Sequence, residues 1–154
     1  YMLCLKPEVT HPFGDRTYVE SVLAAFLAQD EIIVTKKTKK SEKQMDIRPN
    51  IYYAAADQET FCGMTGQDYG ALCLDTAQYR PVVYLQLTAG SVLNIKPELV
   101  MEAFCRFADV PYDPLQFQIH RLEMYGDAHG KKGEVHLLHD ENPCVLVPLS
   151  EFQS

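Results

Sequence analysis

A carboxylate and a guanidinium two residues apart, Asp46 and Arg48, stand in the segment DIRPNI. On an extended backbone, residues at this spacing project to the same face. The planar fork of Arg48 could then grip a phosphate or a carboxylate, while Asp46 orients a ligand hydroxyl or the arginine itself. A purely structural ion pair is the alternative. Because a proline disfavours helical geometry at the residue before it, Pro49 predicts that this segment is extended.

A run of lysines precedes this pair. Six basic and two acidic residues give residues 36–48 a local charge of +4, which leaves −11 on the rest of a chain whose net charge is −7. A basic island on an acidic body can steer a polyanion to one place. A solvated loop whose lysines discourage edge pairing is the alternative. The lysines are Lys36, Lys37, Lys39, Lys40 and Lys43.

Two further segments carry residues that could do chemistry. In IHRLEMY, period-two alternation places His120 on the face opposite Arg121. Histidine titrates near neutral pH, so His120 could act as an acid, a base or a ligand, or it could be a packed strand residue. In LTAGSVLNIKPELV, Gly90 and Ser91 precede a helix N-terminus whose free N–H groups could receive an anion. Ordinary loop residues are the alternative there.

Familiar cofactor and nucleophile motifs are absent from the sequence. It contains no GxGxxG, GxxxxGK[ST], HExxH or GxSxG segment. The five cysteines lie far apart without a CxxC, which predicts no metal site, no cofactor in this chain and a reducing, cytoplasmic setting. No apolar run has the length of a membrane helix, so we expect no membrane contact. These cysteines are Cys4, Cys62, Cys73, Cys105 and Cys144.

A small set of helices and strands must position these residues. Apolar spacing predicts a helix over residues 16–29 with Asp15 as its N-cap, and Pro97 begins a second helix over residues 97–108. Strand patterns flank both helices and make two strand–helix–strand units. These strands cover residues 1–6, 31–37, 80–90 and 115–126. The pattern also predicts two short strands around a glycine-bearing connection over residues 51–77. It predicts a terminal hairpin over residues 133–149.

The pattern predicts an α+β protein. Two strand–helix–strand units favour a ferredoxin-like split β-α-β arrangement on a mainly antiparallel sheet, with both helices on one face. The middle strands and the C-terminal hairpin would be additions to it. Residues 1–154 have the length and the 47% hydrophobic content of one domain. Because Tyr1 already lies in a strand-like pattern, we expect a fragment of a longer polypeptide.

Three segments taken together resemble a bacterial family known as radical-SAM-linked proteins, whose function is unknown. They are KK.K…DIRPNI, LTAGS…IKPELVMEAF and IHR…Y, between about residues 30 and 125. The resemblance implies that the chain is the carboxy-terminal part of the family's domain, without its longer amino-terminal half. Lys96 departs from the family pattern, in which arginine commonly precedes this proline. The characteristic positions are Lys37, Lys40, Asp46, Arg48, Pro49, Gly90, Ser91, Pro97, His120 and Arg121.

The resemblance implies a radical SAM protein as partner, either fused or separate. Its iron–sulfur cluster would lie in that partner, since the cysteines of this chain lack the close spacing that a cluster needs. We therefore expect an accessory domain that binds a substrate or a partner. RNA is the candidate ligand: the strands could present Tyr52 and Tyr53 to bases, while basic residues neutralise phosphates. The anion-binding candidates are Lys37, Lys40, Asp46, Arg48, Ser91 and Arg121.

An independent enzyme is the competing hypothesis. It would act on a nucleotide-like anion with His120 as acid or base and with Asp46 as a second catalytic candidate. A closed pocket that joins His120, Asp46 and Arg48 would favour the enzyme. Dispersal of these residues over separate surfaces would favour the binding domain.

Overall fold

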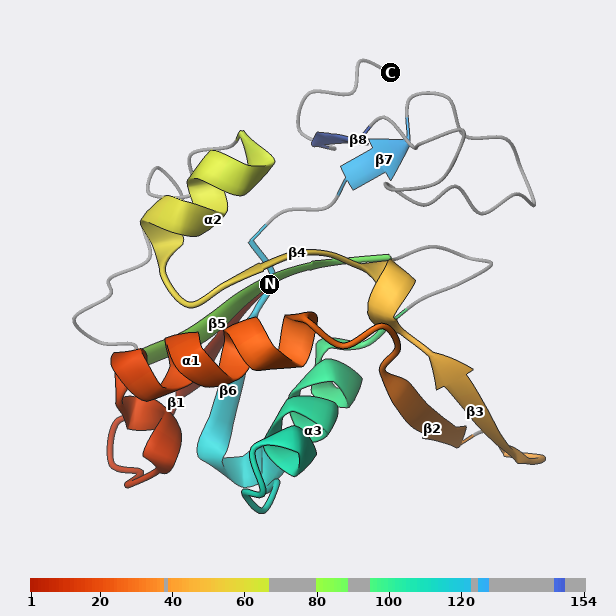
Figure 1. Ribbon diagram of the computed structural model, residues 1–154, viewed down its shortest axis with the longest axis horizontal. Helices are drawn as coiled ribbons and strands as arrows, with labels where there is room; N and C mark the ends of the chain where they lie inside the picture. The colour runs from red at the N-terminus through yellow and green to blue at the C-terminus, as the bar shows by residue number, and fades with distance from the viewer. Residues whose placement is uncertain (38, 67–79, 89–94, 123–124, 128–145, 149–154) are drawn as a thin grey trace.

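The main sheet has four strands in the order β4-β5-β1-β6. A computed structural model describes residues 1–37, 39–66, 80–88, 95–122, 125–127 and 146–148. Within them, β1 (Met2–Leu5), β4 (Ile51–Ala55), β5 (Arg80–Leu87) and β6 (Phe117–His120) form the sheet (Figure 1). Every neighbouring pair is antiparallel.

The strand order and the crossovers confirm the α+β, ferredoxin-like prediction. β5 lies between β1 and β4 and runs antiparallel to both, so β1 and β4 are parallel to each other. The chain between β1 and β4 contains α1 (Arg16–Leu27). In the same way β5 and β6 flank β1, and α3 (Pro97–Phe107) connects them. This is a pair of interleaved split β-α-β units.

The strand that completes the first unit differs from the prediction. The segment after α1 forms β2 (Ile33–Lys37), which pairs with β3 (Glu42–Asp46) in a separate two-stranded sheet. In the main sheet, β4 occupies the position beside β5 that the prediction gave to residues 31–37. The pattern of residues 31–37 predicted a strand correctly, but its partner is the next segment of the chain, β3, which lacks the alternating apolar pattern that would mark it as a strand.

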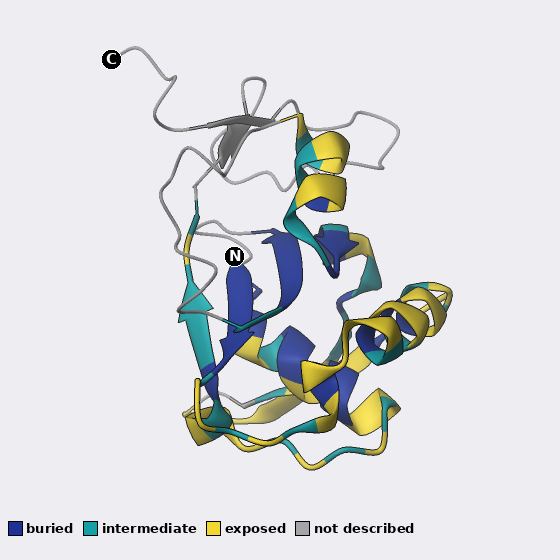
Figure 2. Cartoon of the chain, turned by 90° about the vertical axis from the view of Figure 1, so that its left-hand side faces the viewer, coloured by how far each residue is buried: buried dark blue, intermediate teal, exposed yellow. Residues whose placement is uncertain are grey.

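Both long helices cover the same face of the main sheet, as predicted (Figure 1). Along β1, Leu3 joins the core cluster that also contains Phe26 of α1 and Phe104 of α3, whereas Met2 belongs to a second cluster on the other face. The carboxylate of Asp15 accepts a hydrogen bond from the Thr17 backbone N–H at 3.0 Å and so caps α1. Figure 2 shows buried strands and helices whose outer surfaces are exposed.

The segment predicted as a strand and a glycine-bearing connection contains a helix instead, α2 (Gln58–Thr65). Asp57 caps its first turn, and Gly66 ends it in the left-handed conformation at φ 73°. Phe61 of α2 stacks on Tyr84 of β5, so α2 covers the sheet face opposite α1 and α3. The glycine that we interpreted as part of a strand connection is a helix C-cap.

Two other predicted strands fall partly or wholly outside the described residues. These are the second middle strand, residues 71–77, and most of the hairpin at residues 133–149. The strand predicted over residues 115–126 is divided between β6 and β7 (Tyr125–Asp127), and β7 pairs with β8 (Leu146–Pro148).

His11 holds the segment between β1 and α1. Its Nδ1 accepts a hydrogen bond from the Phe13 backbone N–H at 3.1 Å. Its ring packs against Phe13 and Phe117, with centroid distances of 4.8 and 5.3 Å. Burial lowers the pKa of His11 below its ordinary value. The ring is therefore held in its neutral form, in which Nδ1 can accept this bond.

We expect His11 to make the fold sensitive to acid. Because the pKa of His11 is lower in the folded than in the unfolded chain, its contribution to stability is complete above an unfolded pKa of about 6.5. It is lost as the pH falls through the folded pKa. The urea midpoint should therefore fall more steeply from pH 7 to pH 5 in the native chain than in His11→Asn, whose amide accepts the same bond without titrating. Identical pH profiles would contradict this role.

Candidate functional site

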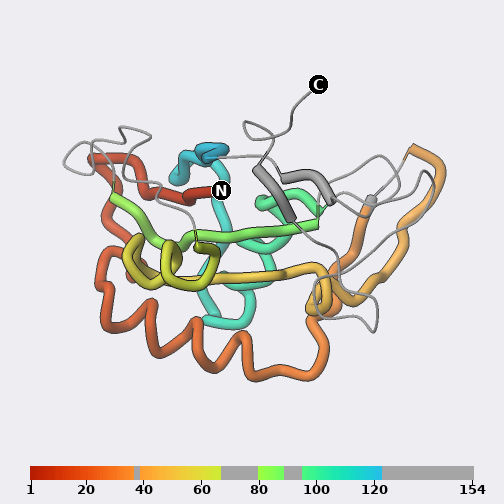
Figure 3. Tube along the Cα trace, turned by 90° about the horizontal axis from the view of Figure 1, so that it is seen from above, coloured from red at the N-terminus to blue at the C-terminus, as the bar shows by residue number. Residues whose placement is uncertain are grey.

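The β2–β3 hairpin carries the lysine run away from the body of the protein (Figures 1 and 3). Lys36 stands directly opposite Lys43, and Val34 pairs with Met45 two residues nearer the base. Alternation places these four residues on one face of the hairpin. Val34 is buried in the core at 4% exposure. This face therefore begins in the hydrophobic core and ends in two lysines.

The remaining lysines of the run lie at the outer end of the hairpin. Lys39 and Lys40 are exposed in the connection between the strands, and Lys37 ends β2, where its backbone pairs with Glu42. At the base, Nη2 of Arg106 donates a hydrogen bond to the carbonyl of Ile33 at 3.2 Å. The β2–β3 hairpin is thus attached to α3 at its base and carries basic residues at its far end.

Asp46 anchors the base of the hairpin. Its Oδ1 accepts hydrogen bonds from the backbone N–H groups of Ile32 at 2.8 Å and Arg48 at 3.0 Å. One carboxylate oxygen therefore ties the residue before β2 to the residues after β3. This geometry does not support the prediction that Asp46 orients a ligand, because Oδ1 already accepts two hydrogen bonds from the protein backbone.

Arg48 stabilises the end of α1. Its Nε donates a hydrogen bond to the carbonyl of Leu27, the last residue of that helix, at 3.1 Å. A helix C-terminus has carbonyls without intrahelical partners and carries a partial negative charge, so a guanidinium is favourable there. Asp46 meets the backbone N–H of Arg48, while the side chain of Arg48 reaches α1. Through these contacts the two residues join α1, β2 and β3, while their role in ligand binding stays a prediction.

The predicted extended geometry of DIRPNI is wrong. Ile47 adopts φ −98° and ψ −1°, and Arg48–Asn50 form one turn of 3-10 helix. The backbone N–H of Asn50 donates to the carbonyl of Ile47 at 3.0 Å, and Ile47 is completely buried. This burial and this hydrogen bond outweigh the local preference of a residue before proline. Pro49 itself fits the first turn because it needs no N–H donor there.

His120 lies far from Asp46 and Arg48. His120, at one edge of the sheet, begins a row of directly paired residues that crosses all four strands. The row continues through Met2 and Tyr84 and ends with Ala55 at the opposite edge. At the usual strand spacing this row is about 14 Å wide. Arg48 precedes the other end of β4, about 13 Å further along the strand direction. The pocket that the enzyme hypothesis requires is therefore not formed by these three residues.

Arg121, another predicted ligand residue, makes a contact outside the hairpin. The guanidinium of Arg121 lies over the ring of Tyr1, 5.8 Å from its centroid, in a cation–π contact. Tyr1 packs against the cluster beneath α1 and α3, whereas His120 shares a face with the α2 side. Gly90 and Ser91 lie outside the described residues.

The tyrosines proposed to stack on bases differ in exposure. Tyr52 is a core residue at 8% exposure, which leaves little of its ring for a ligand. Tyr53 is half-buried and packs against the cluster on the α2 side of the sheet. Tyr52 is therefore a packing residue rather than an exposed stacking surface.

Sequence reasoning missed β3 and the anchors of the hairpin. The available signal was the polar connection TKKS between IIV and QMDI, which fits two strands joined by a short turn. No local pattern indicates that Arg106 bonds to Ile33, because the two residues are distant in the chain.

No metal site is evident in the described ranges. No three His, Cys, Asp or Glu side chains gather there in a way that could hold a metal ion. A cavity of about 10 Å³ between α1, α3 and the sheet is lined by apolar residues and has room for about one water molecule. None of the described helices has the length and apolar character needed to cross a membrane.

Comparison with known proteins identifies one family. The family DUF2344, described as an uncharacterised protein conserved in bacteria, matches residues 6–97. This range includes α1, the β2–β3 hairpin, β4, α2 and β5. No curated protein and no solved structure gives a significant match.

Proposed function

The chain belongs to the DUF2344 family of uncharacterised bacterial proteins, and from this premise we propose that it is an accessory binding domain whose β2–β3 hairpin binds RNA. The observation that carries the proposal is the lysine-rich hairpin that projects from an acidic body. The family description names no reaction, so the proposal rests on the charge of the β2–β3 hairpin and on its projection from the body of the protein.

The charge distribution supports a polyanion at the hairpin rather than on the acidic body. Residues 36–48 carry +4, whereas the rest of the chain carries −11 and repels nucleic acid. A single strand of RNA can follow a basic surface without the rigid groove that a duplex requires. With about three phosphate contacts, binding is weak and falls steeply with salt.

The structure changes which residues we assign to this role. Lys37 and Lys40 remain candidates because both belong to the hairpin. Asp46 and Arg48 act indirectly, since their hydrogen bonds hold the hairpin against α1. Arg121 is left out because its guanidinium contacts Tyr1.

The partner in this proposal is a radical SAM protein. The sequence resemblance supports this partner, and the wide spacing of the five cysteines supports a cluster located in the partner. This chain would hold the substrate or the partner without redox chemistry of its own. A stoichiometric cluster on the purified chain after reconstitution with iron and sulfide would contradict the accessory role.

RNA binding is tested by fluorescence anisotropy with a short single-stranded RNA at several salt concentrations. We expect Lys37→Ala/Lys40→Ala to weaken binding about tenfold at low salt, as expected for the loss of charge-assisted contacts. The slope of log K against log salt should become shallower by about 1.4, because each contact with a single strand contributes about 0.7. Arg48 is kept because its replacement would also remove the contact with α1.

The matched control removes the same charge outside the hairpin, in Lys6→Ala/Lys96→Ala. It should bind RNA with nearly the affinity of the native chain. Equal losses in both variants, or no binding by the native chain at low salt, would eliminate the hairpin as an RNA-binding element. The competing enzyme with His120 as acid or base is not favoured, because His120 is remote from Asp46 and Arg48.

A further inference from the structure

Lys36 and Lys43 form a cross-strand pair of like charges. In directly opposite positions of an antiparallel pair, Cβ atoms lie about 4.5–5.5 Å apart and like charges destabilise the sheet. Their neighbours on the same face of the hairpin are Val34 and Met45. Glu42 occupies a position on the other face. Within this face of the hairpin, therefore, no carboxylate offsets the repulsion between the two lysines.

The base of the hairpin holds this pair in place. Val34 is buried in the core, and Met45 packs against it. Asp46 and Arg106 fix the two strands at the same end through hydrogen bonds to the backbone of Ile32 and Ile33. Lys36 is half-buried whereas Lys43 is exposed. The two lysine side chains thus start from directly opposite backbone positions near an anchored base, which reduces the entropy lost when both contact one ligand.

We propose that Lys36 and Lys43 together bind a single phosphate group of the RNA backbone. A phosphate group presents several acceptor oxygens, and each lysine ammonium has three donors, so one phosphate can lie between both side chains. Its negative charge offsets the repulsion between the lysines, because it attracts both ammonium groups. This inference rests on the proposed RNA-binding function and deepens it by naming the lysines and the chemical group.

A double-mutant cycle in the anisotropy assay tests the shared phosphate. Lys36→Gln and Lys43→Gln should each weaken RNA binding about tenfold, and the double variant hardly more, because either change destroys the shared contact. The control cycle combines Lys36→Gln with Lys40→Gln, which is not opposite to it, and its losses should multiply. Multiplying losses in both cycles would overturn the pair and leave a diffuse basic surface.

The stability of the free protein provides a second measurement. Lys43→Gln should raise the urea midpoint, because it removes the repulsion across the strands. Lys40→Gln removes the same charge at the connection and should leave the midpoint nearly unchanged. If Lys43→Gln lowered the midpoint, the two lysines would not repel each other in the native hairpin, and the proposal would lose its basis.

An NMR titration with inorganic phosphate separates this inference from RNA binding. We expect the side-chain signals of Lys36 and Lys43 to shift along one common saturating curve, while that of Lys40 shifts little. If these signals follow a common curve but the native chain does not bind RNA, the proposed function is contradicted. The inference that Lys36 and Lys43 bind one phosphate together then still stands. Linear, unsaturated shifts of all lysines would overturn the pair even if RNA binds.

Discussion

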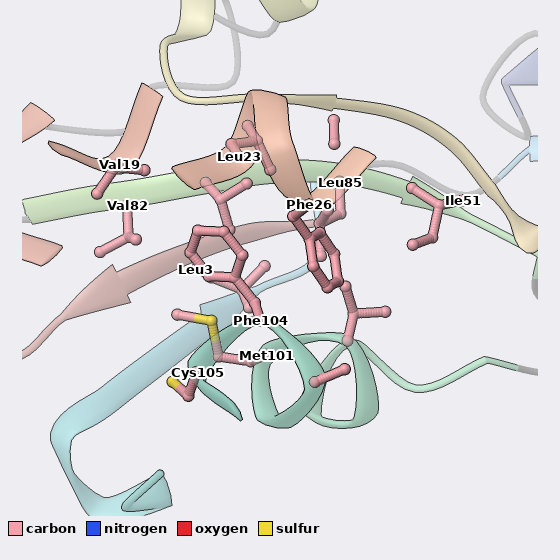
Figure 4. Packing of buried hydrophobic residues seen from close by; sticks show 14 of the residues in the cluster. Leu3, Val19, Leu23, Phe26, Ile51, Val82, Leu85, Met101, Phe104 and Cys105 are labelled. Carbon is pink, nitrogen blue, oxygen red and sulfur yellow. The ribbon is translucent and has the colours of Figure 1, made fainter. Parts of the chain in front are cut away.

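Phe104→Ala is expected to lower the free energy of unfolding by about 3–5 kcal/mol. The ring is 2% exposed and packs against Phe13 and Phe26, with centroid distances of 4.9 and 5.3 Å. Figure 4 shows Phe26 and Phe104 in the space between α1 and α3. Removal of the ring enlarges a cavity that Phe104 already lines. Since small domains have about 5–15 kcal/mol in total, this loss would remove a large fraction of the stability.

Urea denaturation measures this loss, and Phe107→Ala is the control on the same helix. Phe107 also contacts Phe26, at 5.6 Å, but 41% of it is exposed. Its truncation should cost about 1 kcal/mol, because a partly exposed ring buries less apolar area and leaves no closed cavity. If both variants lost the same stability, Phe104 would not be the central contact between the two helices.

Asp46→Ala is expected to lower the free energy of unfolding by about 2–3 kcal/mol, since it leaves two partly buried backbone donors without their acceptor. These donors are the N–H groups of Ile32 and Arg48. The hairpin should also exchange its amide protons faster, because its base loses the link between β2 and the residues after β3. Urea denaturation and hydrogen exchange over residues 33–46 measure the two effects.

Asp46→Asn distinguishes anchoring from ligand binding. Its side-chain oxygen can still accept both hydrogen bonds, so most of the stability should remain. Glu42→Ala, which also removes one negative charge from the hairpin, serves as the control without such bonds. If Asp46→Asn bound RNA much more weakly than Glu42→Ala at unchanged stability, Asp46 would contact the ligand directly, as the sequence alone suggested.

The residues of α1 and α3 are sufficient by themselves to predict both helices. In α1, the spacing of Val19, Leu23 and Phe26 marks one buried face, and Asp15 marks the start. Such signals work because a helix forms between residues that are three or four apart. The two strand–helix–strand units likewise led to the ferredoxin-like sheet, since few arrangements bury both apolar helix faces and the sheet together.

Tertiary structure alone decided the long-range contacts of Asp46 and Arg48. The spacing of two residues was compatible with a ligand clamp and with a structural ion pair, whereas in the structure Asp46 accepts from the Arg48 backbone N–H and the Arg48 side chain bonds to α1. Asp46 accepts from Ile32, and Arg48 donates to Leu27, so each makes its contact with a segment at least 14 residues away. The spacing within DIRPNI carries no information about these contacts, because they arise only when α1 and β2 are packed beside β3. Hydrogen-bond partners across such distances depend on the whole fold, whereas helices depend on their near neighbours.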